Sequence, residues 1–249
     1  EAGQSFLTVA WANWCSTDIG VGDFNGDRRG DLYCLAPGGA LTIAISDGKG
    51  GYTSHPTTPW CAKPRGKSAV GDFDGDGRSD LMCQEDSGQI QTATEWQGNA
   101  FGKRHTWALP YCVSHGGSTY EQDLLGFADF NADGKTDLYC QRVYGQNSGN
   151  LTIHHQLSVA LSKGDGDFLH VIPYPDEASW CDRGVETAQG VYVGGHNERL
   201  FTGDFNGDGR GDFACLQEDA SLEVRLSTGV GAFSAPAVPN GVICPINAT

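Results

Sequence analysis

Apolar residues in this chain occur in short stretches that alternate with polar residues, which indicates β-strands rather than helices. The clearest stretch is Leu41-Thr-Ile-Ala-Ile-Ser46, which is followed by a glycine turn and Tyr52. Similar stretches begin at Ile90, Leu157 and Leu222. The chain contains 36 Gly, which is typical of a protein rich in turns. The pattern therefore predicts an all-β fold.

One acidic segment of nine residues occurs four times, beginning at Asp23, Asp72, Asp129 and Asp204. Positions 1, 5 and 9 are always Asp, position 2 is always Phe, and position 3 is Asn or Asp. Each segment continues into a short apolar stretch that ends in Cys, which indicates a strand leaving the loop. Four copies with this spacing establish a repeat protein.

The four segments have the composition of calcium-binding loops. Oxygens at positions 1, 3, 5 and 9, with a backbone carbonyl at position 7, can surround a hard cation that takes six to eight oxygen ligands. An EF-hand would need Glu at position 12, where every copy has Cys. We expect about four Ca²⁺. The predicted ligands, of which the basic residues act through their carbonyl oxygens, are Asp23, Asn25, Asp27, Arg29, Asp31, Asp72, Asp74, Asp76, Arg78, Asp80, Asp129, Asn131, Asp133, Lys135, Asp137, Asp204, Asn206, Asp208, Arg210 and Asp212.

The first loop differs from the others at position 6. Gly77, Gly134 and Gly209 occupy this position in the other three loops and ease a sharp turn, whereas the first loop has Arg28. We therefore expect the first site to be weaker or its turn to be strained.

Three phrases resemble FG-GAP/VCBS repeats, which form integrin-α-like β-propellers and occur in some fungal lectins. They are Gly22-Asp-Phe-Asn-Gly-Asp, Gly71-Asp-Phe-Asp-Gly-Asp-Gly-Arg and Gly203-Asp-Phe-Asn-Gly-Asp-Gly-Arg. The resemblance covers about residues 6–244. It implies four-stranded blades with Ca²⁺ bridging the first two strands of each, and thus a small β-propeller-like array of four, or five, calcium-binding blades. Members of the family have diverse functions, so the fold is better predicted than the function.

An aromatic or apolar residue followed by Cys occurs five times, ending at Cys15, Cys61, Cys112, Cys181 and Cys244. We interpret each occurrence as a strand that closes one repeat. The expected organisation is one domain, 1–249, with repeats at about 16–61, 62–112, 113–181 and 182–244 and an N-terminal strand, 6–15, that closes the ring. Repeat three is expected to carry an inserted hairpin between Tyr144 and His155.

The sequence between each of the first four of these cysteines and the next acidic loop lengthens along the chain. The two long linkers, 113–127 and 182–202, are therefore candidate recognition loops on one rim. They carry planar hydrogen-bonding groups beside aromatic rings, a combination suited to sugars. The candidate ligand-binding residues are Tyr120, Tyr192, His196, Asn197, Glu198 and Arg199.

Nine cysteines predict disulfides with one thiol left over. Two pairings preserve their alternation along the chain. The favoured one is Cys15–Cys34, Cys61–Cys83, Cys112–Cys140 and Cys181–Cys215, because Cys34 should lie opposite Ile19 or Gly20. It leaves Cys244 for a possible link to a second chain. The alternative is Cys34–Cys61, Cys83–Cys112, Cys140–Cys181 and Cys215–Cys244.

The disulfides, together with sequons at Asn150 and Asn247, predict a secreted glycoprotein. The formal net charge of −15 disfavours nucleic-acid binding, and no apolar run is long enough for membrane insertion. We expect a calcium-stabilised, lectin-like module that binds glycans or another extracellular surface, such as that of a protein. The alternative is an extracellular carbohydrate-active or other hydrolytic enzyme, for which the sequence shows no catalytic motif. Turnover of polysaccharides that is abolished by changes at His115, His170 or His196 would support it.

Overall fold

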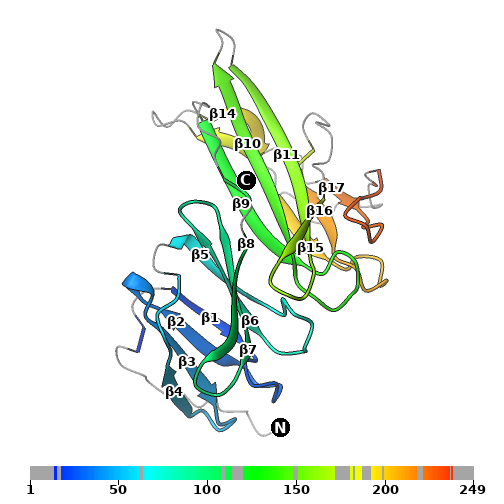
Figure 1. Cartoon of the computed structure of the whole chain (residues 1–249). Helices are drawn as coiled ribbons and strands as arrows, with labels where there is room; N and C mark the ends of the chain where they lie inside the picture. The colour runs from blue at the N-terminus through cyan, green and yellow to red at the C-terminus, as the bar shows by residue number, and fades with distance from the viewer. Residues whose placement is uncertain are drawn as a thin grey trace, which may run out of the picture. The chain divides into compact units, whose positions relative to one another are not determined.

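The computed structural model describes residues 14–15, 18–61, 64–107, 110–113, 120–147, 151–171, 180–181, 183–186, 192–197, 199–217, 221–235 and 237. Within these residues the chain is all-β (Figure 1), and the helical structure consists of one 3₁₀ turn at Pro37–Gly39. The predicted fold class is confirmed at this level. Among the described residues, no helix has the length and apolar character needed to cross a membrane.

The chain forms two compact units. The first contains residues 1–110 and 164–167, and the second contains residues 111–163 and 168–249. In the first unit, two antiparallel sheets each have four strands in chain order. Sheet one consists of β1 (Asp18–Gly22), β2 (Asp31–Leu35), β3 (Leu41–Ser46) and β4 (Tyr52–Pro56), and sheet two of β5 (Pro64–Gly71), β6 (Asp80–Glu85), β7 (Ile90–Trp96) and β8 (Phe101–Trp107).

The second unit repeats this plan and adds a separate hairpin. Sheet three consists of β9 (Tyr120–Ala128), β10 (Asp137–Asn147), β11 (Leu151–Ser162) and β12 (Phe168–Val171), and sheet four of β15 (Arg199–Gly203), β16 (Asp212–Leu216) and β17 (Leu222–Arg225). The additional hairpin is β13 (Arg183–Glu186) with β14 (Tyr192–Asn197). The predicted insertion in repeat three lengthens both β10 and β11, which remain paired out to Asn147 and Leu151.

The four acidic segments, which we call loops one to four (residues 23–31, 72–80, 129–137 and 204–212), join the first two strands of each sheet. Position 9 of every loop pairs with the last residue of the preceding strand, as Asp31 does with Gly22. The same register occurs in the other three sheets, at Gly71↔Asp80, Ala128↔Asp137 and Gly203↔Asp212. One repeated sequence thus produces one repeated hairpin.

Apolar residues of neighbouring sheets form the core of the first unit. Phe24, at position 2 of loop one, is fully buried with Leu81, Ala93 and Trp96 of sheet two, and its ring centroid lies 6.2 Å from that of Phe101. The phenylalanine at position 2 of loop one therefore anchors sheet one to sheet two.

The second unit has the same anchor. Phe130 of loop three is fully buried, and its ring centroid lies 5.0 Å from that of Phe213 and 5.7 Å from that of Phe233, both of which belong to repeat four. The cluster also contains Tyr139 of β10 and Val159 and Leu161 of β11.

Backbone hydrogen bonds also connect consecutive loops within each unit. The Ser79 N–H donates to the carbonyl oxygen of Asp23 at 2.7 Å, and the Asp23 N–H donates to Ser79 Oγ at 2.8 Å. In the second unit, the Gly211 N–H donates to the carbonyl oxygen of Asp129 at 2.5 Å. A Cβ at Gly211 would lie 2.7 Å from that of Ala128, so this approach requires glycine.

Four intrachain disulfides are present, which confirms the prediction of disulfide bonds. They join Cys15 to Cys34, Cys61 to Cys83, Cys112 to Cys140 and Cys181 to Cys215, in the first of the two registers considered. Cys34 lies opposite Ile19, as expected. Because all four bonds are within the chain, none supports a disulfide-linked dimer, and Cys244 lies outside the described residues.

The interpretation of the aromatic-Cys elements as strands is wrong where the structure describes them. Cys61, Cys112 and Cys181 have φ values of 53°, 54° and 57°, in the left-handed region that a strand does not use. Each lies at a turn or irregular segment, where the disulfide fixes it to the strand leaving the acidic loop. In the expected N-terminal strand 6–15, residues 6–13 lie outside the described part, and Trp14 and Cys15 are not in a strand.

Candidate functional site: four acidic loops

The Asp carboxylate at position 1 of each acidic loop accepts hydrogen bonds from backbone N–H groups further along the same loop. In loop one, Asp23 Oδ1 accepts hydrogen bonds from the N–H groups of Gly26 and Asp27, at 2.8 and 3.0 Å. Asp23 Oδ2 accepts a third from Arg28 N–H at 2.6 Å. The same three bonds recur around Asp72 and Asp204. Around Asp129 the bonds from positions 5 and 6 recur, and Asn131 N–H supplies a further one at 3.3 Å.

The carboxylate at position 5 pairs with the basic residue at position 7. Lys135 Nζ lies 2.7 Å from Asp133 Oδ2, and Arg210 Nη2 lies 2.5 Å from Asp208 Oδ2. Partial burial acts to raise the pKa of Asp133, but hydrogen bonds from Lys135 outweigh it and lower this pKa. The pKa values of Asp76 and Asp208 are lowered in the same direction, so these three carboxylates favour the ionised form that a cation needs.

The carboxylate at position 9 is buried in all four loops and connects the loop to the sheet. Its Oδ2 atom accepts the N–H of the position-2 phenylalanine, as from Phe205 to Asp212 at 2.9 Å. In loops one, three and four, Oδ1 accepts a second N–H from a serine at the end of the third strand or, in sheet four, two residues beyond it. These donors are Ser46, Ser162 and Ser227, at 2.8, 2.7 and 2.8 Å.

Loop two lacks this second donor. The corresponding residue is Glu95, whose φ of 59° interrupts the regular pairing of β7 with β8. Asp80 Oδ1 is consequently buried without a hydrogen-bond partner, in a residue that is 1% exposed. The serine-to-glutamate difference at this position is a sequence signal that could have identified loop two as distinct.

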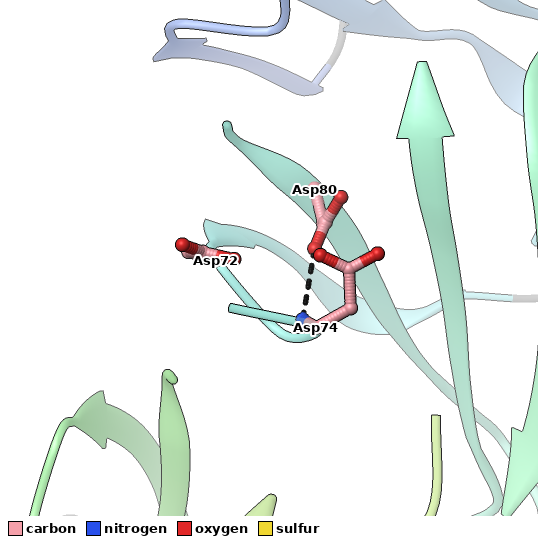
Figure 2. Close-up of side chains that lie close together, drawn as sticks. All are labelled: Asp72, Asp74 and Asp80. Atoms are coloured by element: carbon pink, nitrogen blue, oxygen red, sulfur yellow. Dashed lines mark hydrogen bonds between the residues drawn. The ribbon is translucent and has the colours of Figure 1, made fainter. Parts of the chain in front are cut away.

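Loop two also carries an additional carboxylate, because position 3 is Asp74 instead of Asn. Figure 2 shows Asp72, Asp74 and Asp80 together, with a hydrogen bond from Asp74 N–H to Asp80 at 3.3 Å. One oxygen from each carboxylate lies within 4.8 Å of the others. Among the described residues this is the one cluster of three such groups, and its geometry suits a hard cation.

Burial raises the pKa of Asp80 to about 8, and the negative charge of Asp74 contributes to this rise. Burial also raises the pKa of Asp137 in loop three to about 7, although its two backbone hydrogen bonds oppose the effect. Both carboxyls would have to lose a proton to bind a cation through ionised oxygens.

Every loop requires a left-handed backbone at two positions. Position 6 has φ of 81° at Gly77, 80° at Gly134 and 85° at Gly209, whereas Arg28 adopts 66° in loop one. The strain expected in loop one therefore has a structural basis. The other left-handed residue, at position 4, was missed from the sequence, and in loop three it is Ala132 with φ of 59°.

Ala132→Gly is expected to raise the free energy of unfolding by about 0.5–1 kcal/mol, because glycine relieves the left-handed strain at a smaller entropic cost. Urea denaturation would measure the change. The control is Ala100→Gly, at a turn residue without positive φ, where the same substitution should lower stability. Equal effects at the two positions would contradict the explanation.

The predicted rim residues are located only in part. Tyr192, His196 and Asn197 lie on β14, where the sequence led us to expect an irregular loop, and Arg199 begins β15 and is exposed. Tyr120 begins β9, and Glu198 lies outside the described residues.

Two overlapping segments, residues 23–83 and 72–140, match the family model of the FG-GAP-like repeat. The resemblance inferred from the loop motifs is thereby confirmed, and the chain contains FG-GAP-like repeats. Loop four lies beyond the matched segments but has the same motif and register.

Among solved structures, the fold is similar to that of a lectin from Agrocybe aegerita, described as specifically recognising non-reducing terminal N-acetylglucosamine. The TM-score is 0.62 with 21% sequence identity, over 88% of this chain and 50% of the lectin chain. The chain therefore spans about half the length of that lectin. Comparison with curated proteins gave no match.

Proposed function

We propose that this chain is a calcium-stabilised recognition module that binds glycans. The observation that carries the proposal is the similarity of the fold, over 88% of the chain, to a lectin described as recognising terminal N-acetylglucosamine. The disulfides support a location outside the reducing cytosol, and we infer a secreted protein.

Calcium fits the donor chemistry of the loops. Loop two is the strongest candidate, since it combines four carboxylates with one guanidinium, whereas loop one has three carboxylates and two guanidinium groups. The unpartnered Asp80 Oδ1 also favours loop two as the strongest calcium site. A buried anionic oxygen without a hydrogen-bond donor is costly unless a proton or a cation neutralises it. Bound Ca²⁺ would supply positive charge that joins the first two strands of a sheet.

The glycan would contact the long segments that precede loops three and four. Hairpin β13–β14 holds Tyr192, His196 and Asn197 on an ordered strand instead of a free loop, which lowers the entropic cost of binding. Imidazole, amide and guanidinium groups can donate to sugar hydroxyls, and an aromatic ring can pack against the apolar face of a sugar.

A glycan array, read with calcium and again with EDTA, tests this proposal. We expect binding to glycans with non-reducing terminal N-acetylglucosamine and loss of that binding when galactose covers the terminal sugar. His196→Ala and Arg199→Ala should each weaken binding by at least about tenfold, or 1.4 kcal/mol. Lys49→Ala, at an exposed turn residue, should not. If the calcium-loaded protein bound no glycan, the proposed function would be wrong.

A further inference from the structure

Consecutive acidic loops in each unit share a backbone hydrogen bond between position 8 of the later loop and position 1 of the earlier loop. In the first unit, the Ser79 N–H donates to the carbonyl oxygen of Asp23 at 2.7 Å. In the second unit, the Gly211 N–H donates to the carbonyl oxygen of Asp129 at 2.5 Å. Loops one and two therefore form one pair, and loops three and four form another.

A glycine on one side of each junction permits this approach. A Cβ at Gly22, just before loop one, would lie 2.7 Å from the Cβ of Ser79. A Cβ at Gly211 would lie 2.7 Å from the Cβ of Ala128, just before loop three. The glycine belongs to the earlier loop in the first unit and to the later loop in the second. Because two side chains could not approach this closely, each pair of loops is held at a fixed spacing.

The hydrogen bond joins two peptide groups that lead to predicted calcium ligands. The Ser79 N–H belongs to the same peptide group as the Arg78 carbonyl, which is the position-7 ligand expected in loop two. The Asp23 carbonyl belongs to the same peptide group as the Phe24 N–H, which donates to Oδ2 of Asp31 at 3.0 Å. Asp31 is the position-9 ligand expected in loop one and is fully buried. Two peptide groups in series therefore connect a carbonyl of loop two to a carboxylate of loop one.

The second unit contains the same series. The Arg210 carbonyl of loop four shares its peptide group with the Gly211 N–H, which donates to Asp129. The Phe130 N–H of the next peptide group donates to Oδ2 of Asp137 at 2.8 Å. Phe130 and Asp137 are each 0% exposed, so water does not compete for this last bond.

We propose that loops one and two bind calcium as a cooperative pair, and that loops three and four do the same. The inference rests on the proposed calcium function and adds which sites act together. The position-7 carbonyl is polarised when it binds a cation, and hydrogen bonds in series strengthen one another. Occupation of the later loop therefore orders the peptide groups that hold the position-9 carboxylate of the earlier loop in place.

The coupling is expected to matter most for loop one. This loop has three carboxylates, two guanidinium groups and a strained Arg28, whereas loop two has four carboxylates. Repulsion between two cations opposes the coupling, but salt screens it between exposed sites. A coupling of ordinary size raises the calcium affinity of one loop about 5–150-fold when its partner is occupied, by the same factor in both directions.

Calcium titrations of the whole chain, labelled with nitrogen-15 at glycine and followed by NMR, test the proposal. In each loop a glycine N–H donates to the position-1 carboxylate and so reports occupation of its own loop. These residues are Gly26, Gly77, Gly134 and Gly209. Asp76→Asn removes a ligand of loop two and should weaken calcium binding in loop one at least about fivefold, with loops three and four unchanged. Asp208→Asn, the matched variant of loop four, should weaken loop three and leave loops one and two unchanged.

A charge-neutral variant separates the hydrogen-bonded series from a simple loss of negative charge. Ser79→Ala keeps every predicted ligand but removes the Oγ atom that accepts the Asp23 N–H at 2.8 Å. It should weaken calcium binding in loop one at least about twofold, as expected for one hydrogen bond. Ser87→Ala is the control, because that hydroxyl bonds only within an exposed turn of sheet two, to Gln89. The effect of Asp76→Asn should persist in about 1 M potassium chloride, where the Debye length is about 3 Å.

The outcomes separate this proposal from the calcium function on which it rests. If no glycine N–H responds to calcium, the calcium function itself is wrong. If the loops respond but loop one has the same affinity in the wild type and in Asp76→Asn, calcium binding stands and the coupling is wrong. An effect that disappears in high salt, or a Ser79→Ala variant that behaves like Ser87→Ala, would also overturn the coupling. Far-ultraviolet circular dichroism checks that Asp76→Asn is folded, and Ser79→Ala keeps the test decisive if it is not.

Discussion

Phe130→Ala is expected to lower the free energy of unfolding by about 3–5 kcal/mol, as is typical for removing a buried aromatic ring from a core. The Phe130 ring is fully buried against Phe213, Phe233 and Tyr139, with centroids 5.0, 5.7 and 6.1 Å away. Truncation would leave a cavity in the packing of the second unit. Urea denaturation, followed by tryptophan fluorescence and circular dichroism, would measure the loss.

Phe205→Ala is the matched control for this experiment. It removes the same ring from the same position of the repeat, but the ring is already 48% exposed. The expected loss is below about 1 kcal/mol, typical of a partly exposed surface position. If the two substitutions cost the same, the position-2 phenylalanine is not an anchor between sheets.

In EDTA, the free energy of unfolding is expected to decrease as the pH rises from about 4 to about 8. Burial raises the pKa of Asp80 to about 8 and that of Asp137 to about 7, compared with 3.8 for an ordinary aspartate. In this range the folded protein holds protons that the unfolded chain has released. Each such group therefore lowers stability by up to about 1.4 kcal/mol per pH unit until its folded pKa is passed.

The lowered pKa values of Asp76, Asp133 and Asp208 act in the opposite direction, but only in more acidic solution. Their contribution is present above pH about 4 and is lost as the pH falls through their folded pKa. Calcium should stabilise the protein more at pH 8 than at pH 5, because the cation must displace the protons of Asp80 and Asp137. Thermal unfolding with calcium and with EDTA at both pH values would measure this difference.

Asp80→Asn separates the role of loop two from that of the other loops. In EDTA at pH 8 this variant should be at least as stable as the wild type, since a neutral amide replaces a buried carboxylate whose Oδ1 has no donor. Asp212→Asn should instead be destabilising at every pH, because both oxygens of Asp212 accept backbone N–H groups. A wild-type pH slope in Asp80→Asn would contradict the assignment of that slope to Asp80.

The repeated hairpins could be predicted from the sequence because each is encoded locally. The spacing of Asp and Phe in loops one to four fixes the turn, and the alternating residues after each loop fix the strands. The disulfide register was also accessible, since the antiparallel pairing brings Cys34 opposite Ile19 next to the short linker from Cys15.

Features that depend on tertiary contacts could not be predicted in this way. Hairpin β13–β14 lies in a Gly-rich linker without a clear alternating pattern. The left-handed φ of Cys61 has no local sequence signal, because the residue is neither Gly nor Asn. It occurs where Cys61 forms its disulfide with Cys83. The unpartnered oxygen of Asp80 arises from the backbone of Glu95, fifteen residues away, so inspection of the nine-residue motif alone does not reveal it.

The contacts between consecutive sheets have a consequence for how such a chain evolves. In the first unit, sheet one is joined to sheet two by the Phe24 ring and by the hydrogen bonds between Asp23 and Ser79. In the second unit, sheet three is joined to sheet four by the Phe130 ring and by the hydrogen bond from Gly211 to Asp129. A duplicated gene segment that encodes one more sheet would bring its own phenylalanine and its own loop hydrogen bonds. The number of repeats can therefore change without redesign of the existing core, and stability should grow by a similar increment with each added copy.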